Sequence, residues 1–450
     1  MLRFISHAKD SVKHAMIHGH IISKFLAIDF QCSWCQNNCF VGRCYYQGLS
    51  NQKDVFMTAI TCMGFQAAGI HSGLKSNPDK DLGLIYSETP ASVAGVFTTN
   101  RIKAAPVLIT QKRIQSGISH GIIVNSGNAN CCNGDQGHQS ALDMAGAAAR
   151  GLGLKDQDIL VASTGVIGDV FPIEKVNHAV PDLIKALRPD GFRDLATAIM
   201  TTDTVHKLEY RQGRIHEQSF TLVGMAKGSG MIAPDMATML CFLCTDISIT
   251  PSLLKKILGG AVDKTLNRIC IDGDTSTNDT TLIFANGQSQ VSIDSLEQAG
   301  EFQFLLEDIL KGLAKRLVKD GEGASKCVDI IIKGALSNQD AHAIAHTIAT
   351  SPLVKTALFG EDANWGRLIA AAGRAGVPIQ PDTIDIYFNQ VQMTRNSLGC
   401  GPEAEILATR VLKEPEFAIV MDLNMGEGSA SVLTCDFSID YIKINADYRS

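Results

Sequence analysis

The chain has 450 residues, enough to bury a large core and to form two domains or lobes. Hydrophobic residues make up 45% and charged residues 19%, as is usual for globular proteins, and the formal net charge is −6. This balance, with no long Lys/Arg run, excludes the basic surface that is typical of nucleic-acid-binding proteins. No apolar run reaches the length of a membrane span, and 13 cysteines without a recognisable secretory signal favour reduced thiols in the cytoplasm.

Residues 1–56 differ in character from the rest of the chain. They contain a CxxC pair followed by two further cysteines, Cys32, Cys35, Cys39 and Cys44. Four cysteines can close a tetrahedral zinc site, but this spacing matches no common zinc module. We interpret residues 1–56 as a poorly structured extension, or as a stretch upstream of the true start, because Met57 begins a segment with the pattern of a domain.

From Thr58 onward, short β-like runs alternate with Gly-rich turns and Ala-rich helical patterns. This predicts a mixed α/β fold without the regular βαβ rhythm of a doubly wound sheet. Strands are predicted at residues 82–87, 94–98, 121–124, 159–162, 239–245, 383–390 and 417–422. Helices are predicted at residues 139–151, 252–265 and 296–318.

The most informative motif is KGSGMIAPDMATML, residues 227–240, in which a Gly-rich turn leads through Ala237 and Thr238 into an apolar strand. A hydroxyl at the head of a strand, behind a small residue, suits attack on the preceding carbonyl. Such an acyl shift would cut the chain before Thr238 and free an α-amine with an intrinsic pKa of about 7.7–8.0. That amine could act as general base for its own hydroxyl. Taken alone, the stretch is more often an ordinary Gly-Pro loop that ends at a buried threonine.

Two further stretches contain groups that acyl transfer needs. STGVIG, residues 163–168, follows a predicted strand, and its backbone N–H groups and the Thr164 hydroxyl could stabilise an oxyanion. One such donor is typically worth about 2.7–4 kcal/mol of barrier. DGEGASK, residues 320–326, presents the Glu322 carboxylate between two glycines on exposed backbone, where it suits an amine ligand or forms a solvated turn. Each motif is weak by itself.

Several familiar motifs do not apply. The phosphate-loop pattern GxxxxGK[ST] is absent, which argues against nucleotide hydrolysis. DGDTSTNDT, residues 272–280, has acidic spacing like a calcium loop, but its glycine is misplaced and the twelfth position lacks glutamate. A hydrogen-bonded turn network near a site is the favoured interpretation. No GxSxG or HExxH is present, and the scattered histidines give a Ser-His-Asp triad no support.

Ten segments occur in a distinctive order from Met57 to Ser450. They are GFQAAGIHSGLK, AGVFTTNRIKAAPV, VNSGNAN, STGVIG, MTTDT, KGSGMIAPDMATML, DGDTSTNDT, DGEGASK, GEDANWGR and NADYRS. Together they resemble the glutamate N-acetyltransferase / ornithine acetyltransferase family of arginine biosynthesis. Ordered agreement over so many unusual segments is highly specific, and it reverses the interpretation that each motif receives alone.

The resemblance implies a precursor that cuts itself between Ala237 and Thr238. The products would be an α chain, residues 57–237, and a β chain, residues 238–450, which form a heterotetramer of two α and two β chains or a multiple of it. The implied fold is that of the DmpA superfamily, with stacked α/β layers.

The resemblance also implies the site. Thr238 matches the family nucleophile, and Thr164 and Gly165 match its oxyanion hole. The substrate-binding positions correspond to Thr201, Thr202, Lys227, Thr238, Glu322, Asn445 and Ser450. Which threonine of MTTDT contacts substrate is left open.

The implied activity is transfer of the acetyl group from N2-acetyl-L-ornithine to L-glutamate through an acetyl-threonine enzyme, a ping-pong cycle without metal or bound cofactor. Some family members also use acetyl-CoA as donor, and no sequence feature decides this point. One alternative is an N-terminal-nucleophile aminopeptidase or amidohydrolase of the same superfamily, and another is a paralogue acting on a related acyl-ornithine. A non-catalytic scaffold is disfavoured, because the nucleophile and the oxyanion turn are both present.

Overall fold

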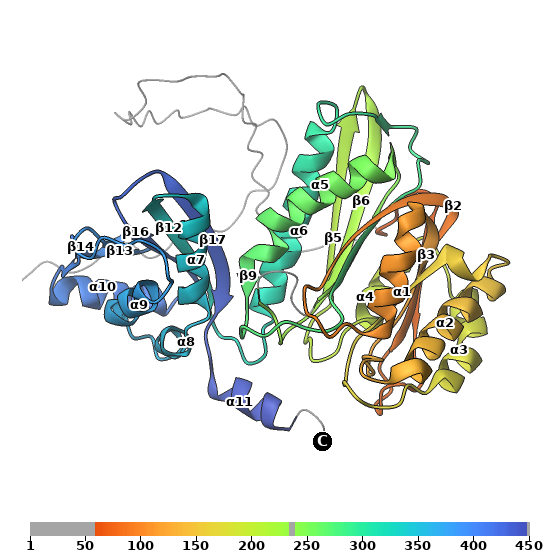
Figure 1. The fold of residues 1–450 in the computed structure, drawn as a ribbon, viewed down its shortest axis with the longest axis horizontal. Coiled ribbons are helices and arrows are strands. Elements are labelled where there is room, and N and C mark those ends of the chain that lie inside the picture. Colours follow the sequence, from red (N-terminus) through yellow and green to blue (C-terminus); the bar gives the residue numbers. More distant parts are fainter. Residues whose placement is uncertain (1–58, 234–238, 448–450) are drawn as a thin grey trace, which may run out of the picture. The chain divides into compact units, whose positions relative to one another are not determined.

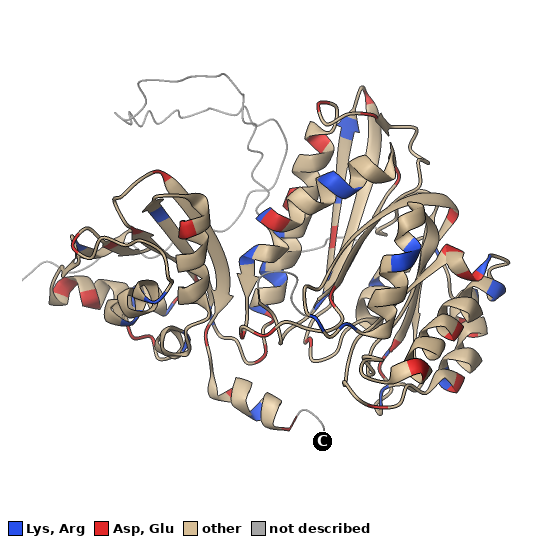
Figure 2. Cartoon of the chain, viewed as in Figure 1, with Lys and Arg blue, Asp and Glu red and all other residues tan. Residues whose placement is uncertain are grey.

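The computed structural model describes residues 59–233 and 239–447, which belong to one compact unit (Figure 1). Strands and helices are interspersed along these residues and build two large β-sheets and a short strand pair, so the predicted mixed α/β class is confirmed. Within the two ranges, no helix is both long and apolar enough to cross a membrane. Figure 2 shows acidic and basic residues mixed along the helices.

The larger sheet joins early and later parts of the chain. Its strands lie in the order β4 (Ile159–Ser163), β3 (Ile118–Asn125), β2 (Leu82–Phe97), β10 (Thr280–Ala285), β7 (Leu240–Thr245), β6 (Gln218–Lys227) and β5 (Lys207–Ile215), with β1 (Phe65–Ile70) paired to β2. The pairs β3–β4 and β7–β10 are parallel, and the others are antiparallel. Because β6 and β7 are neighbours, the expected α and β chains, residues 57–237 and 238–450, share this sheet; the boundary between them stays a prediction.

Helices pack against both faces of the larger sheet. One face carries α1 (Ala105–Arg113), α2 (Gly134–Gly151) and α3 (Ile173–Lys185) over β1–β4, and α5 (Pro251–Lys264) and α6 (Gly300–Lys319) over β6, β7 and β10. Helix α4 (Phe192–Ala198) belongs to a different apolar cluster. Ile123 packs in the α2 cluster, whereas Ile122 and Val124 pack in the α4 cluster, because successive strand side chains point to opposite faces.

The second sheet is formed mainly by the last third of the chain. Its order is β15 (Leu398–Gly399), β14 (Val391–Arg395), β13 (Asp385–Phe388), β16 (Glu416–Asp422), β12 (Cys327–Ala335), β17 (Gly428–Cys435) and β9 (Ile269–Cys270). Its apolar core includes residues of α7 (Asn338–Ala349), α8 (Pro352–Phe359), α9 (Trp365–Gly373) and α10 (Pro402–Leu412). The remaining elements are β8 (Ser248–Ile249), β11 (Ser292–Ile293), α11 (Ile439–Ala446) and the 3-10 helices η1 (Ile114–Ser116), η2 (Asp156–Asp158) and η3 (Leu266–Arg268).

The predicted elements are largely confirmed, but several bounds differ. Helix α2 begins at Gly134 rather than at residue 139, and the strand predicted at residues 383–390 spans only Asp385–Phe388. Residues 82–87 and 94–98 were expected as separate strands but belong to one long strand, β2, whose register with β3 shifts between Tyr86 and Ala91. Polar residues around the shift interrupt the apolar pattern, although Ser87 still pairs with Phe65 of β1 and the strand continues to Phe97. Helix α6 begins at Gly300 rather than at residue 296, because residues 296–299 form a turn closed by Ala299 N–H and Leu296 C=O.

Strand and helix ends bring the predicted functional segments together. Thr164 follows β4, Lys227 ends β6, and Glu322 follows the carboxyl end of α6. In the β6–β7 pairing, Lys227 lies opposite Leu240, two residues after Thr238. The fold therefore brings the head of strand β7 next to Lys227.

Candidate active site

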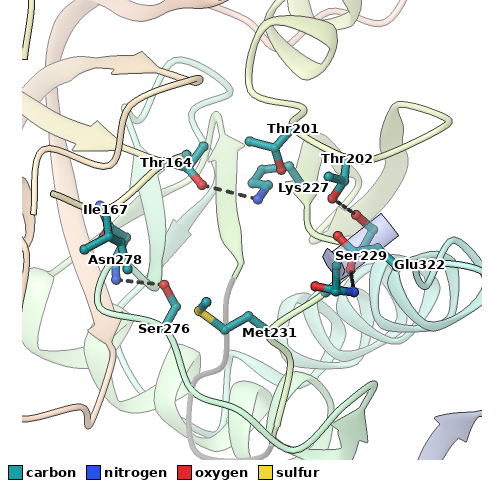
Figure 3. A pocket seen from close by; sticks show the side chains of 13 residues that line it. Thr164, Ile167, Thr201, Thr202, Lys227, Ser229, Met231, Ser276, Asn278 and Glu322 are labelled. Carbon is teal, nitrogen blue, oxygen red and sulfur yellow. Dashed lines mark hydrogen bonds between the residues drawn. The ribbon is translucent and has the colours of Figure 1, made fainter. Parts of the chain in front are cut away.

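One pocket contains most of the predicted site residues (Figure 3). It is lined by Thr164, Gly165, Ile167, Thr201, Thr202, Lys227, Ser229, Gly230, Met231, Ser276, Asn278, Glu322 and Asn445. The structure thus brings together every predicted position that it describes. Ala237, Thr238 and Ser450 lie outside the described residues, as do the four cysteines of residues 1–56.

The turn after β4 requires glycine at one position. Gly165 has φ +131°, and a Cβ there would lie 2.3 Å from the carbonyl carbon of Gly127 and 2.5 Å from the nitrogen of Asn128. Because both atoms belong to backbone, a side chain at Gly165 would push the two loops apart. The STGVIG turn and the VNSGNAN loop are therefore in direct backbone contact.

Asn278 joins these two loops to a third. Its side-chain amide donates to the carbonyls of Ala129 at 2.7 Å and Ser163 at 2.8 Å. The composition of DGDTSTNDT predicted a hydrogen-bonded turn network near a site, and the contacts of Asn278 form such a network. Among the described residues, no group of three or more His, Cys, Asp or Glu side chains is arranged to hold a metal ion.

Lys227 is a buried cation with a neutral partner. Its side chain is 3% exposed, and its Nζ donates to Thr164 Oγ1 at 3.3 Å. Burial lowers the pKa of Lys227, against the nearby charge of Asp203, and no carboxylate in the described part of the chain forms an ion pair with it. The ammonium is available for an anionic ligand, and the Thr164 hydroxyl keeps its own proton to donate.

A buried ion network lies behind the pocket. Lys207 is fully buried, and its Nζ contacts Asp203 Oδ1 at 2.5 Å and Asp320 Oδ2 at 2.6 Å. Asp203 also accepts hydrogen bonds from the backbone N–H groups of Thr201 at 3.0 Å and Gly228 at 2.7 Å. Burial would raise the pKa of Asp203, but the charges of Lys227 and Lys207 outweigh this and hold it below its usual value.

The same network sets the position of Glu322. Asp320, two residues earlier, is held by Lys207 and by the N–H of Thr204. Glu322 N–H donates to Ser229 C=O at 2.7 Å, and Glu322 Oε2 accepts from Asn445 Nδ2 at 2.8 Å. The expected exposed position of Glu322 is wrong, because its side chain is 8% exposed. The loop turns inward, since Asp320 and the Glu322 N–H are both tied to buried partners.

The two predicted threonines occupy different positions in the pocket. Thr202 Oγ1 lies 2.7 Å from Ser229 Oγ, while the Thr201 N–H is held by Asp203 and its side chain reaches the same pocket (Figure 3). Both line the pocket, so the geometry does not discriminate between them. Ser229 was not predicted, although it lies in the KGSG turn and its neighbours signalled the site.

Two acidic side chains hold the chain on either side of residues 234–238. Asp272 accepts from the N–H groups of Met231 at 2.5 Å and Ile232 at 2.9 Å. Asp279 Oδ1 accepts from Met239 N–H at 2.9 Å, and burial raises the pKa of Asp279 well above its usual value. DGDTSTNDT thus fixes both flanks of the predicted cleavage segment.

A buried cation, Lys227, and a buried carboxylate, Glu322, thus line one small cavity. The ArgJ family model matches residues 66–450. Proteins named arginine biosynthesis bifunctional protein ArgJ are similar over 86% of this chain and 99% of their own length, at 46% identity in Geobacter sulfurreducens and 49% in Desulfotalea psychrophila. The chain belongs to the ArgJ family and is an enzyme.

Solved structures also resemble parts of the chain. An arginine biosynthesis bifunctional protein from Bacillus halodurans matches 45% of this chain and 95% of its own, at 35% identity and a TM-score of 0.43. An ornithine acetyltransferase from Mycobacterium tuberculosis, complexed with ornithine, matches 38% of this chain and 92% of its own, at 36% identity and a TM-score of 0.34.

Lys207→Met should destabilise the protein by about 3–5 kcal/mol, because it leaves two buried carboxylates without their cation. Urea unfolding measures this change. Lys319→Met is the matched control, since Lys319 pairs with Glu416 on the surface and should change stability by about 0–1 kcal/mol. Because the pKa of Asp203 is lowered, the network's contribution should be present above pH about 3.9 and be lost as the pH falls through that lowered pKa. Equal unfolding midpoints for the two variants would contradict the role of Lys207.

Gly165→Ala should destabilise the fold more than Gly168→Ala. Both glycines have positive φ, at +131° and +90°, but a Cβ at Gly168 meets no atom within 4 Å. Backbone strain alone is worth about 1–3 kcal/mol, and Gly165→Ala adds the collision with Gly127 and Asn128. Thermal melting of the two variants separates strain from collision, and similar midpoints would rule out the close approach of the loops.

Proposed function

We propose that this enzyme transfers the acetyl group of N2-acetyl-L-ornithine to L-glutamate through an acetyl-Thr238 intermediate. The observation that carries the proposal is one pocket that combines the Thr164–Gly165 turn, the Glu322 carboxylate and the Lys227 ammonium, which forms no ion pair within the described residues. Strand β7 begins at Leu240, two residues after Thr238 in the sequence, and Leu240 pairs with Lys227 in the sheet. Membership of the ArgJ family supports the same activity.

The charges of the pocket match acetylornithine. Lys227 would bind the α-carboxylate, because its buried ammonium has only a hydroxyl partner among the described residues. Glu322 would bind the side-chain ammonium, with Asn445 orienting the carboxylate through the hydrogen bond to Oε2. Neither Lys227 nor Glu322 forms a direct ion pair within the described residues, so a ligand that brings the opposite charge to each would be stabilised at both ends.

Maturation precedes catalysis. The Thr238 hydroxyl attacks the carbonyl carbon of Ala237, the peptide nitrogen leaves as the α-amine of Thr238, and water hydrolyses the resulting ester. The chain then ends at Ala237 and a second chain begins at Thr238. Asp272 and Asp279 hold the residues on either side of this segment and would keep the two new ends close to the pocket.

Acetyl transfer then uses both groups of Thr238. The α-amine takes the hydroxyl proton as the oxygen attacks the acetyl carbonyl, and Thr164 and Gly165 stabilise the oxyanion. The amine returns the proton to the departing nitrogen, so ornithine leaves and an acetyl ester remains. Glutamate enters, its α-amine attacks the ester, and N2-acetylglutamate leaves as Thr238 regains its proton. The active species would be a cytoplasmic heterotetramer of two α and two β chains. It would need no resident metal or bound cofactor. Acetyl-CoA is a second donor to be assayed.

Thr238→Ala should leave the precursor uncut and inactive, because it removes the hydroxyl needed for cleavage and for acetyl transfer. On a denaturing gel, the wild-type protein should give fragments of residues 1–237 and 238–450, with Thr238 first in N-terminal sequencing of the second. Thr238→Ser keeps a hydroxyl and should still be cut. An intact wild-type chain with full activity would refute Thr238 as an N-terminal nucleophile.

Glu322→Gln should raise the KM for acetylornithine by about 10- to 100-fold, because it removes a charge-assisted contact of about 1.5–3 kcal/mol. The KM for glutamate should stay the same or fall, since glutamate carries no side-chain cation. Initial rates with each substrate varied in turn measure both constants.

Glutamate-dependent release of ornithine also separates this transferase from a hydrolase, which passes the acyl group to water at the same rate without glutamate.

A further inference from the structure

The pocket is polar except at two side chains. Of its described lining residues, Ile167 and Met231 alone carry apolar side chains, and the rest are hydroxyl, amide, charged or glycine residues. Figure 3 shows Ile167 and Met231 on the side toward Ser276, away from Thr202 and Glu322. The apolar side of the pocket is therefore distinct from the side that carries the carboxylate.

Ile167 is fixed by its turn. It lies two residues after Gly165, and the turn is held by the hydrogen bonds Ala129 N–H to Val166 C=O at 2.9 Å and Gly168 N–H to Cys131 C=O at 3.1 Å. Its side chain also packs against the buried apolar cluster that includes Ala129 and Cys131. These hydrogen bonds and this packing hold Ile167 at the wall of the pocket.

Met231 occupies a backbone conformation that a methionine rarely adopts. Its φ is +56°, and the Asp272 carboxylate holds it there by accepting from the N–H groups of Met231 and Ile232. The next residue back, Gly230, lies against the Glu322 carboxylate, because a Cβ there would be 2.5 Å from Glu322 Oε2 and would displace it. Strain of this kind persists where the surroundings impose it, often at functional sites, and here it holds a flexible apolar side chain at the pocket, 40% exposed.

We propose that Ile167 and Met231 form the acyl subsite and limit the transferred group to acetyl. The inference rests on the proposed function. With the acyl oxygen at the Thr164–Gly165 turn, the nearest apolar wall for the methyl group is Ile167 on the same turn, and Met231 closes the space from the KGSG loop. One methylene more or less in a hydrophobic pocket changes specificity by about 10- to 200-fold, so two apolar side chains suffice to discriminate acetyl from longer chains.

The experiment measures kcat/KM for ornithine release, with glutamate as acceptor, from N2-acetyl-, N2-propionyl- and N2-butyryl-ornithine. The wild-type enzyme should favour acetyl over propionyl by at least about tenfold. Met231→Ala and Ile167→Val should each reduce that ratio by about tenfold, mainly by raising the rate with the longer acyl groups. Met63→Ala is the matched control, because Met63 is 57% exposed and lies outside the pocket, and its ratio should equal that of the wild type.

The outcomes separate the subsite from the proposed function. If the wild-type enzyme releases no ornithine from acetylornithine, the proposed function fails and the acyl subsite fails with it. If acetyl transfer occurs but butyryl is used equally well, or if both variants keep the wild-type ratio while remaining folded and cut, the acyl subsite alone is overturned. If Met231→Ala loses the acetyl preference but Met231→Leu keeps it, the side chain at this position acts as a steric wall, and the loss is not a general loosening of the site.

Discussion

The geometry of the pocket depends on the buried ion network of Asp203, Lys207 and Asp320. Lys207 lies between a carboxylate on the MTTDT segment and a carboxylate on the DGEGASK loop, at 2.5 and 2.6 Å. Each segment carries one side of the pocket, so a single buried ammonium sets the distance between the threonine side and the Glu322 side. A buried cation with two carboxylates tolerates little displacement, because any separation leaves a charge in a low-dielectric interior.

The opposite side of the pocket is held by neutral groups. Backbone contact at Gly165 joins the STGVIG and VNSGNAN loops, and the two hydrogen bonds of Asn278 tie both to a segment more than a hundred residues further along the chain. This leaves Lys227 with a hydroxyl partner rather than a carboxylate, and its charge faces the cavity. The site therefore combines a buried ion network that sets its width with a neutral turn that presents hydrogen-bond donors. This arrangement suits the proposed reaction, in which a carbonyl oxygen becomes negative.

The sequence predicted the residues that line the pocket better than the buried ion network of Asp203, Lys207 and Asp320 that holds them in place. Thr164, Gly165, Lys227, Glu322 and Asn445 were all predicted and all meet in one cavity. The supports were missed because a lysine or an aspartate in a sequence carries no sign of burial, and charged residues are usually exposed. For the same reason Glu322 was expected in solvent. Two flanking glycines indicate a turn, but the direction of that turn depends on the partners of Asp320 and of the Glu322 N–H, which are Lys207 and Ser229 in other parts of the fold.

The sequence by itself determined the family, the mixed α/β class, most strands and helices, and the residue types that meet at the site. These features follow from local patterns and from the order of motifs along one chain. Only the tertiary structure decided that MTTDT and DGEGASK share one buried lysine, that β2 is continuous, and that Ile167 and Met231 form the apolar side of the pocket. The reason is physical: burial, charge pairing and close backbone approach arise between segments distant in sequence, and only the folded chain sets those distances.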